Sequence, residues 1–514
     1  MKKIHIPLSA LIAIALSLSL AACSNGSSPG PSASAPSDAS GGVASVLPLR
    51  FYMPGTGNNL DPSVIAKVNE KLASDQVGLD FQPLYIPWDA WVDRINIMIS
   101  SNEEFELFHI MGDYVPYSAY YSRGAIQPLN EVIEQHAPDL LSFFNEDAWR
   151  CVSMDGKIYS IPDEWRDNSG DLYGNLHIRQ DKLDAAGLTI SDNFTIEELL
   201  DALEQLQDSW GGNVTPYIWD HSPTRPPIAL HRYYDSWPYY TSLDGLFYVN
   251  LEGEAKAYFE TEEFAKDCAI YAEMYNRGLI HPDILSVPQD TKNTLTTDGD
   301  ILAGFDTFGE EGETALKNKF PEADIAPYRT APEKPAVQDS PVLNMNAVPI
   351  SAKHPESGVK FLNWLYSDEA NHDLVIYGIE GTHYSAVEGD YIKTVYNEDT
   401  NLPLHRFDEW MVANLRYLKF EEGTPESIVS DWKGVTNPVV KLPSTGFAFD
   451  SEPVKVEYAQ VRAEYDAVIL PIKLGVVDYE ENMPAALSTM KAAGIDLVVK
   501  EYQRQLDDYV ASAK

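Results

Sequence analysis

The sequence predicts an α/β protein with more than one hydrophobic core. Three observations support this: a length of 514 residues, a composition that is 44% hydrophobic and 22% charged, and alternating strand and helix patterns from residue 47 onward. A single core stops growing near about 250–300 residues, so a chain of this length needs at least two. The composition excludes collagen-like, coiled-coil and disordered proteins.

The first elements alternate between strand and helix. Residues Leu47–Met53 form a strand candidate, and Pro62 stands at the first position of a capped helix. The stretch Val77–Ile86 returns as a strand, apolar residues from Trp91 to Ile99 recur at helical spacing, and Phe105–Met111 is apolar and extended. This β-α-β-α-β order predicts a mostly parallel sheet that is covered by helices.

Helical patterns recur further along the chain. Residues 195–207 open with a capping box and then keep their apolar side chains on one face. A second helix is predicted over residues 355–365, and an amphipathic helix is predicted over residues 495–510. We find no internal repeat.

The charge balance limits the possible partners. Lysine and arginine number 37 against 78 acidic residues, which gives a formal net charge of −41. Such a chain repels phosphate backbones, so we expect no nucleic-acid partner. Strongly anionic ligands are disfavoured, whereas neutral and cationic ligands remain open.

The N-terminal residues predict export and membrane anchoring. Residues 1–22 begin with two lysines and continue with an apolar stretch that is too short and too interrupted to be a comfortable membrane span. The stretch ends in Leu20-Ala21-Ala22-Cys23, which resembles a bacterial lipobox, so we expect lipidation at Cys23. An ordinary cleavage site with a chance cysteine is the alternative. Residues 23–46 are rich in serine, glycine and proline and form a flexible tether.

The remaining cysteines and the histidines indicate no metal site. Cys151 and Cys268 lie 117 residues apart in a chain that needs no staple, so buried free thiols are favoured over a disulfide. No group of cysteines and histidines has zinc-ligand spacing. We therefore expect neither a metal nor a cofactor.

An aromatic stretch is the most unusual part of the sequence. Nine of the 33 residues from 216 to 248 are aromatic. One interpretation is a sugar-binding wall, because a sugar ring lays its apolar CH face on tryptophan or tyrosine while its hydroxyls bond to acidic side chains. The other interpretation is that these rings pack a proline-rich loop against the body of the protein.

No catalytic motif stands out. Asp163 and Glu164 are adjacent and would face opposite ways in a strand, so they make a poor pair of glycosidase carboxylates. The segment Gly55-Thr56-Gly57 has no Walker lysine after it, and the sequence contains neither Gly-x-Ser-x-Gly nor His-Glu-x-x-His. We expect a protein without catalytic residues.

Several short motifs follow one another along the chain. They include Gly124-x-x-x-Pro128-Leu129, Asp155-Gly156-Lys157-Ile158-Tyr159-x-Ile161-Pro162, Tyr377-Gly378-x-Glu380-Gly381 and Gly446-Phe447-x-Phe449-Asp450. Their order resembles that of the lipid-anchored extracellular solute-binding proteins, of the family 1 type, that serve carbohydrate ABC transporters, in a subgroup from Gram-positive soil bacteria with an uncharacterised C-terminal domain. One departure is the pair Phe108-His109, where many relatives carry an aspartate, a change that could alter the choice of ligand.

The resemblance implies a two-lobed, periplasmic-binding-protein-like fold of type II, with the ligand cleft at the hinge. Each lobe would be a mostly parallel sheet covered by helices. The expected first lobe comprises residues 47–163 and 341–367. The expected second lobe comprises residues 164–340 and 368–514, and includes the C-terminal domain from about residue 440.

The resemblance and the strand order together predict the ligand-binding residues. Loops at the carboxyl ends of sheet strands meet where α/β folds bind ligands. Trp237, which precedes Pro238, has the packing role as its alternative. The predicted ligand-binding residues are Thr56, Asp113, Tyr114, Glu164, Trp165, Arg166, Trp219, Asp220, Trp237, Tyr239, Tyr240, Asn344 and Asn346.

The resulting functional hypothesis is a non-catalytic receptor, anchored by its lipid at the extracellular face of the cell membrane. It would capture a sugar or an oligosaccharide as a monomer and deliver it to the permease subunits of an ABC importer. Two alternatives stay open: a lipid-anchored secreted glycoside hydrolase, and a surface lipoprotein that binds a peptide or another polymer.

Overall fold

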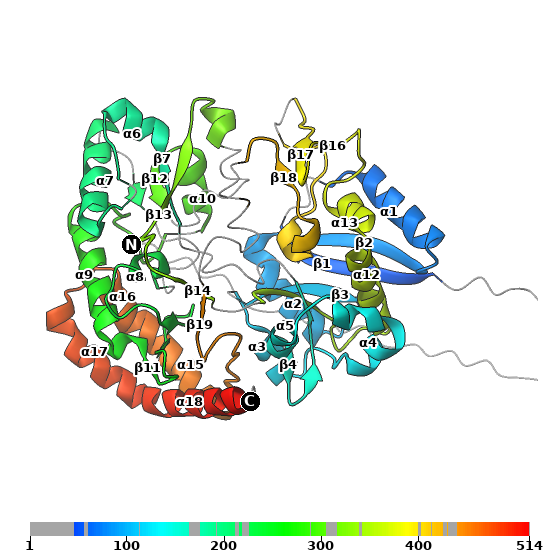
Figure 1. Cartoon of the computed structure of the whole chain (residues 1–514). Helices are drawn as coiled ribbons and strands as arrows, with labels where there is room; N and C mark the ends of the chain where they lie inside the picture. The colour runs from blue at the N-terminus through cyan, green and yellow to red at the C-terminus, as the bar shows by residue number, and fades with distance from the viewer. Residues whose placement is uncertain are drawn as a thin grey trace, which may run out of the picture. The chain divides into compact units, whose positions relative to one another are not determined.

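A computed structural model of the chain describes residues 46–55, 60–112, 114–163, 175–191, 193–210, 215–217, 226–287, 289–304, 316–338, 342–398, 402–412, 414–424, 429 and 439–512. Within these ranges the two largest sheets have five and four strands, and each sheet belongs to its own hydrophobic core (Figure 1). We call the elements around these two cores the first and the second lobe.

The five-stranded sheet of the first lobe has the order β2-β1-β3-β15-β6. Strand β1 pairs in parallel with β2 and β3, as the alternating sequence pattern predicts, and β15 runs antiparallel to both β3 and β6. The strands are β1 (Leu47–Pro54), β2 (Leu79–Ile86), β3 (Leu107–Met111), β15 (Asn344–Ala347) and β6 (Ile161–Pro162).

Helices cover this sheet. Asp61 caps the first of them, since its side chain accepts a hydrogen bond from the Ser63 N–H at 2.6 Å. Apolar residues at helical spacing turn one face of each helix toward the strands, and α1 contacts β2 while α12 contacts β1 (Figure 1). The helices are α1 (Pro62–Ser74), α2 (Trp91–Ser100), α3 (Tyr117–Ser122), α4 (Asn130–His136), α5 (Glu146–Cys151), α12 (Pro355–Ser367) and α13 (Glu369–Ile376).

The first core extends further along the chain than the expected lobe boundaries. Buried residues from Val375 to Val412 belong to the same core as Phe51 and Phe361. Residues 368–514 were expected in the second lobe. Of these, residues 375–412 belong to the first lobe. The reason is packing between distant segments: Phe407 contacts Phe81 and Tyr85, which are more than 300 residues earlier in the chain.

The four-stranded sheet of the second lobe has the order β13-β7-β12-β8. Only the pair β12–β8 is parallel within this sheet, whereas β7 runs antiparallel to both β12 and β13. A mostly parallel sheet was predicted for each lobe, and in this sheet that prediction is wrong, because two of the three strand pairs are antiparallel. The strands are β7 (Asn175–Arg179), β8 (Thr215–Tyr217), β12 (Ile301–Gly304) and β13 (Ile325–Arg329), and the main helices are α6 (Gln180–Ala186), α7 (Ile196–Trp210) and α9 (Glu262–Asn276).

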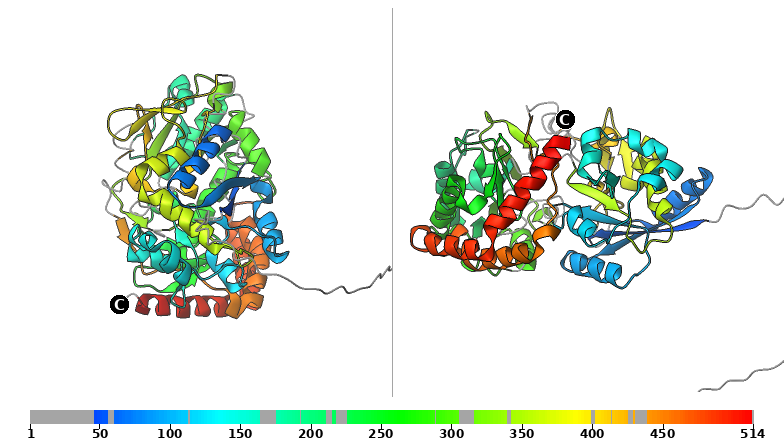
Figure 2. Two further views of the ribbon diagram at one scale, coloured as in Figure 1. Left: turned by 90° about the vertical axis from the view of Figure 1, so that its right-hand side faces the viewer. Right: turned by 90° about the horizontal axis from the view of Figure 1, so that it is seen from below.

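The C-terminal helices complete the second core. Tyr502 stacks on Phe247 with ring centroids 4.0 Å apart, and Gly475 lies so close to the backbone of Ala272 that a Cβ atom would clash. Helices α15, α17 and α18 contact one another (Figure 2). The helices are α15 (Lys455–Glu464), α16 (Leu470–Lys473), α17 (Tyr479–Ala493) and α18 (Ile495–Ser512), with a π-helical turn at Tyr465–Ile469.

Two buried ionisable side chains, Lys473 and Asp267, lie where these helices meet α9. The Lys473 side chain is fully buried, and burial lowers its pKa to about 8 although the charge of Asp267 opposes that shift. Asp267 is itself buried and accepts a hydrogen bond from the Tyr234 hydroxyl at 2.8 Å. His231 lies 3.2 Å from the same carboxylate.

Residues 439–512, which we call the C-terminal segment, also contact helices of the first lobe. The Ser118 hydroxyl donates to the carbonyl of Phe449 at 2.9 Å, and the Ser122 hydroxyl donates to the Asp450 carboxylate at 2.5 Å. The Arg150 guanidinium lies over the ring of Tyr509 at 4.6 Å. Residues of α3 and α5 are thus linked to the C-terminal segment by two hydrogen bonds and one cation–π contact.

Cys151 and Cys268, the two cysteines among the described residues, are buried and form no disulfide, as predicted. Cys23 and the tether lie outside the described residues. In the parts of the chain that the structure covers, no helix has the length and apolar character needed to cross a bilayer.

A buried histidine predicts acid sensitivity of the first lobe. His405 accepts a hydrogen bond from the Asp61 N–H at Nδ1 (3.1 Å) and donates from Nε2 to the Val375 carbonyl (3.0 Å). Burial lowers its pKa to about 4. As the pH falls from 6.5 toward 4, His405 becomes protonated in the unfolded chain but stays neutral in the folded chain. The free energy of unfolding should therefore fall by roughly 3 kcal/mol.

This prediction can be checked by chemical denaturation at several pH values. His405→Gln should remove the titrating group, so its pH profile between 6.5 and 4 should be flatter than that of the native chain. Parallel profiles for the two proteins would contradict the prediction.

Candidate functional site

Three aromatic residues lie together where strands of the first sheet end. Trp88, in the turn η1 (Trp88–Ala90) after β2, is 42% exposed, and Tyr114, after β3, is 46% exposed. The Trp88 ring lies 5.7 Å from Tyr114 and 5.8 Å from Trp410, which belongs to the turn η4 (Glu409–Met411). Trp88 and Trp410 are stacked at an interplanar angle of 25°. We call Trp88, Tyr114 and Trp410 the aromatic platform.

The platform lies at the edge of the sheet where α/β folds bind ligands. Strands β2, β1 and β3 are parallel, so their carboxyl ends meet at one edge, and Trp88 and Tyr114 each follow one of these ends. Tyr114 is the predicted ligand-binding residue that the structure brings to this edge in an exposed position. Two large aromatic side chains left open to solvent in one place are typical of a binding surface.

Buried polar side chains support the platform from below. His109 on β3 meets Trp410 edge-on, with ring centroids 5.1 Å apart and an interplanar angle of 75°. Its Nδ1 lies 3.2 Å from Oδ1 of Asn346, and its Nε2 lies 3.2 Å from Oδ1 of Asn344. Asn346 also donates to the Met411 carbonyl at 3.0 Å. Asn344 and Asn346, predicted as the floor of the ligand site, are buried and face His109.

One charged pair lies beside Trp410, and Asp89, next to Trp88 in η1, is exposed. Arg406 contacts Glu409 through two hydrogen bonds, from Nε at 3.2 Å and from Nη2 at 2.5 Å. This bidentate pair stands in the segment that carries Trp410 and adds no net charge there. The exposed rings of the platform suit a ligand with an apolar face.

The aromatic stretch of the second lobe is mostly buried. Trp237 is 6% exposed, its Nε1 donates to the Pro335 carbonyl at 2.8 Å, and its ring meets Tyr239 edge-to-face at 5.5 Å. Tyr239 is buried as well, and burial raises its pKa above the usual range, while Tyr240 is half-buried in the short strand β9 (Tyr240–Thr241). The structure therefore favours the packing interpretation of Trp237 and Tyr239.

The other predicted site residues lie outside the described part of the chain. The structure covers their neighbours: Gly55 directly follows β1, Asp163 is buried directly after β6, and Tyr217 ends β8. The residues concerned are Thr56, Asp113, Glu164, Trp165, Arg166, Trp219 and Asp220.

Sequence reasoning missed Trp88 and Trp410 as site residues, and it noted His109 only as a departure from the family pattern. Trp88 had a usable signal, because Pro87-Trp88 directly follows a predicted strand at the ligand-binding edge. Trp410 had none, since it lies in no predicted element and reaches the platform only through the packing of residues 375–412 on the first core.

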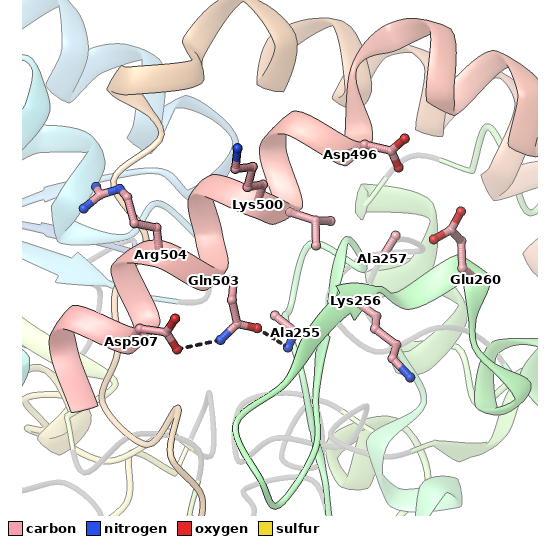
Figure 3. Close-up of a pocket in the computed structure, with 10 residues that line it drawn as sticks. Ala255, Lys256, Ala257, Glu260, Asp496, Lys500, Gln503, Arg504 and Asp507 are labelled. Atoms are coloured by element: carbon pink, nitrogen blue, oxygen red, sulfur yellow. Dashed lines mark hydrogen bonds between the residues drawn. The ribbon is translucent and has the colours of Figure 1, made fainter. Parts of the chain in front are cut away.

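A groove of about 500 Å³ lies elsewhere, between α18 and the strand β11 (Ala255–Ala257) (Figure 3). Gln503 closes the outer edge of β11, because it accepts from the Ala255 N–H at 2.6 Å and donates to the Gly253 carbonyl at 2.9 Å. The groove is lined by charges of both signs, including Lys256, Glu260 and Arg504, and it has no aromatic ring in its wall. It contains none of the predicted ligand-binding residues.

The described residues offer no group of three or more histidine, cysteine, aspartate and glutamate side chains that could hold a metal ion. The chemistry available at the platform is stacking, supported by hydrogen bonds beneath it.

Comparison with known protein families gives two matches. The profile of the family described as "Bacterial extracellular solute-binding protein" matches residues 57–372. The profile of "Domain of unknown function (DUF3502)" matches residues 443–511, which include the C-terminal helices.

Similar proteins come from bacterial sugar transport. A "Carbohydrate ABC transporter substrate-binding protein" of Streptococcus pneumoniae is 22% identical over 472 residues, which is 89% of each chain. The solved structure of the "N-glycan transport solute binding protein (NgtS)" of the same species has a TM-score of 0.72 at 20% identity and covers 91% of this chain and 100% of that one. An "HMO binding ABC-transporter associated Solute Binding Protein" from Bifidobacterium longum infantis has a TM-score of 0.60 at 14% identity and covers 90% and 99%. These likenesses establish the two-lobed fold of solute-binding proteins.

The burial of Trp237 leads to a prediction about stability. Trp237→Ala should remove a ring that is enclosed by Tyr239, Val337 and Leu442, and should lower the free energy of unfolding by roughly 3–5 kcal/mol. Ligand affinity of the folded fraction should stay unchanged. A variant with native stability and weakened ligand affinity would assign Trp237 to the binding surface instead.

Proposed function

Because this chain belongs to the family of bacterial extracellular solute-binding proteins, we propose that it captures a neutral oligosaccharide outside the cell and delivers it to the permease subunits of an ABC importer. The observation that carries this proposal is the aromatic platform, with Trp88 and Tyr114 exposed at the ligand-binding edge of the first sheet.

The chemistry of the platform supports a sugar. A pyranose ring has an apolar CH face that covers an indole ring well, and its hydroxyls remain free for bonds to polar groups around it. Trp410 backs Trp88 on one side, so the exposed indole is held in place before a ligand arrives. The names of the relatives point the same way, since one solved NgtS structure is a complex with Man5GlcNAc.

Transport rather than hydrolysis is the proposed activity. The similar proteins are binding proteins of ABC transporters. Asp163, one of the two adjacent acids, is 1% exposed, so its carboxylate does not stand on an open surface. A glycoside hydrolase would need a second carboxylate about 5–10 Å away across a bound sugar.

The platform predicts a binding defect that leaves stability intact. Trp88→Ala should weaken binding of Man5GlcNAc, or of the best ligand in a panel of neutral oligosaccharides, by about tenfold or more, which corresponds to ~1.4 kcal/mol. Isothermal titration calorimetry measures this change. Because Trp88 is 42% exposed, the melting temperature should move little.

A matched control is Tyr396→Ala, which removes another exposed ring, at 39% exposure. It should leave sugar affinity unchanged. Native sugar affinity in Trp88→Ala would refute the platform as the sugar site, and binding of peptides but of no sugar would replace the proposed ligand class.

We also propose that Cys23 carries the lipid that anchors the protein to the extracellular face of the membrane. The support is the sequence pattern Leu20-Ala21-Ala22-Cys23 with the polar tether that follows it. Two or more acyl chains hold a protein stably at a bilayer, whereas one holds it weakly.

Cys23→Ser should release the protein from membranes, because the thiol is the attachment atom. Cell fractionation with detergent extraction tests this, and Cys151→Ser serves as the control that keeps the anchor. A Cys23→Ser protein that still requires detergent for extraction would disprove lipidation at this residue.

A further inference from the structure

We propose that His109 is a positioning residue for the aromatic platform: it sets the place of Trp410 and, through Trp410, of Trp88. The inference rests on the proposed function and deepens it, because it names the side chain that fixes the positions of the rings proposed to bind the sugar. Its main test does not require a ligand, so the two proposals can fail separately.

The contacts form layers from the core outward. His109 on β3 stands directly opposite Asn346 on β15 in the antiparallel register. The His109 ring meets Trp410 edge-on at 5.1 Å, and Trp410 stacks on Trp88 at 5.8 Å. Trp88 is the exposed end of this series, and His109, which is fully buried, is the inner end.

Asn346 holds both the histidine and the turn that carries Trp410. Its Nδ2 donates to the carbonyl of Met411, the residue after Trp410, at 3.0 Å. With the amide nitrogen turned to that carbonyl, its Oδ1 faces His109 and accepts the hydrogen bond from Nδ1–H at 3.2 Å. One side chain therefore holds both the imidazole and η4.

Asn344 holds the other side of the imidazole. Its amide lies 3.2 Å from Nε2 of His109. Either end of an amide can serve this contact, because the oxygen accepts from a ring N–H and the NH2 group donates to a bare ring nitrogen. Since the histidine and both asparagines are buried, loss of one partner would leave unpaired polar groups inside the lobe.

An edge-to-face contact constrains the partner ring more tightly than a smooth apolar wall does. The rings of His109 and Trp410 lie edge to face at an angle of 75°, which is a preferred arrangement for a pair of aromatic rings. If the imidazole moves, Trp410 loses the contact that sets its tilt, and Trp88 loses the surface on which it stacks. Binding surfaces that are held before the ligand arrives lose less entropy on binding.

The stacked pair Trp88–Trp410 provides a direct spectroscopic reading of this arrangement. Two indoles at this distance should give a paired positive and negative band in the circular dichroism spectrum, and both Trp88→Phe and Trp410→Phe should abolish it. His109→Phe keeps an aromatic edge but removes both hydrogen bonds, whereas His109→Gln keeps hydrogen-bonding groups but removes the ring. Each should shrink the paired band about twofold or more.

The matched control is His231→Gln, which replaces another fully buried histidine, in the second lobe. It should leave the paired band at native size. Asn344→Ala removes the contact with Nε2 and leaves the His109 ring in place, so it tests the proposal if a His109 variant does not fold. A native paired band in every folded variant of His109 and Asn344 would overturn the positioning role.

Affinity separates this proposal from the proposed function. If the platform binds the sugar, the His109 variants should weaken Man5GlcNAc binding up to the loss seen in Trp88→Ala, about tenfold. A reduced paired band together with native sugar affinity in all variants, Trp88→Ala included, would refute the platform as the sugar site and support the positioning role of His109. Weakened affinity with an unchanged paired band would overturn the positioning role.

Discussion

The insertion of β15 between β3 and β6 is the constraint on which the first lobe and its candidate site depend. This strand arrives more than 180 residues after β6 and runs antiparallel to both neighbours. It completes the sheet, and the same pairing sets Asn346 opposite His109. A shift by one residue would turn Asn344 and Asn346 to the other face of the sheet, so the register of one short strand decides whether His109 has partners.

The C-terminal segment is attached to the two lobes by different kinds of contact. On the second lobe it is held by buried aromatic and aliphatic packing, exemplified by Tyr502 on Phe247, and by Lys473 buried near Asp267. On the first lobe it is held by hydroxyl hydrogen bonds and by Arg150 over Tyr509. Polar contacts exchange with water at a small net cost, whereas the apolar packing is lost only with the core itself. The C-terminal segment is therefore an integral part of the second lobe.

The acidity of the chain is compatible with a candidate site that is built from aromatic rings. A net charge of −41 disfavours anionic ligands. Beside the platform, Arg406 and Glu409 neutralise each other. The binding surface consequently relies on ring faces, which do not depend on salt or on the charge of the ligand in the way that ion pairs do.

The sequence by itself determined the local elements. The strands and helices from Leu47 to Met111, the capped helix near residue 195, the amphipathic C-terminal helix and the two buried thiols were all predictable, because periodicity and capping are read from neighbouring residues. The tertiary structure alone decided which aromatic residues are exposed. Trp237 is enclosed by Pro335, Val337 and Leu442, and Trp88 is backed by Trp410, more than 300 residues away. The position of Trp88 directly after a strand indicates where the residue lies, but the exposure of a ring depends on distant segments that pack against it.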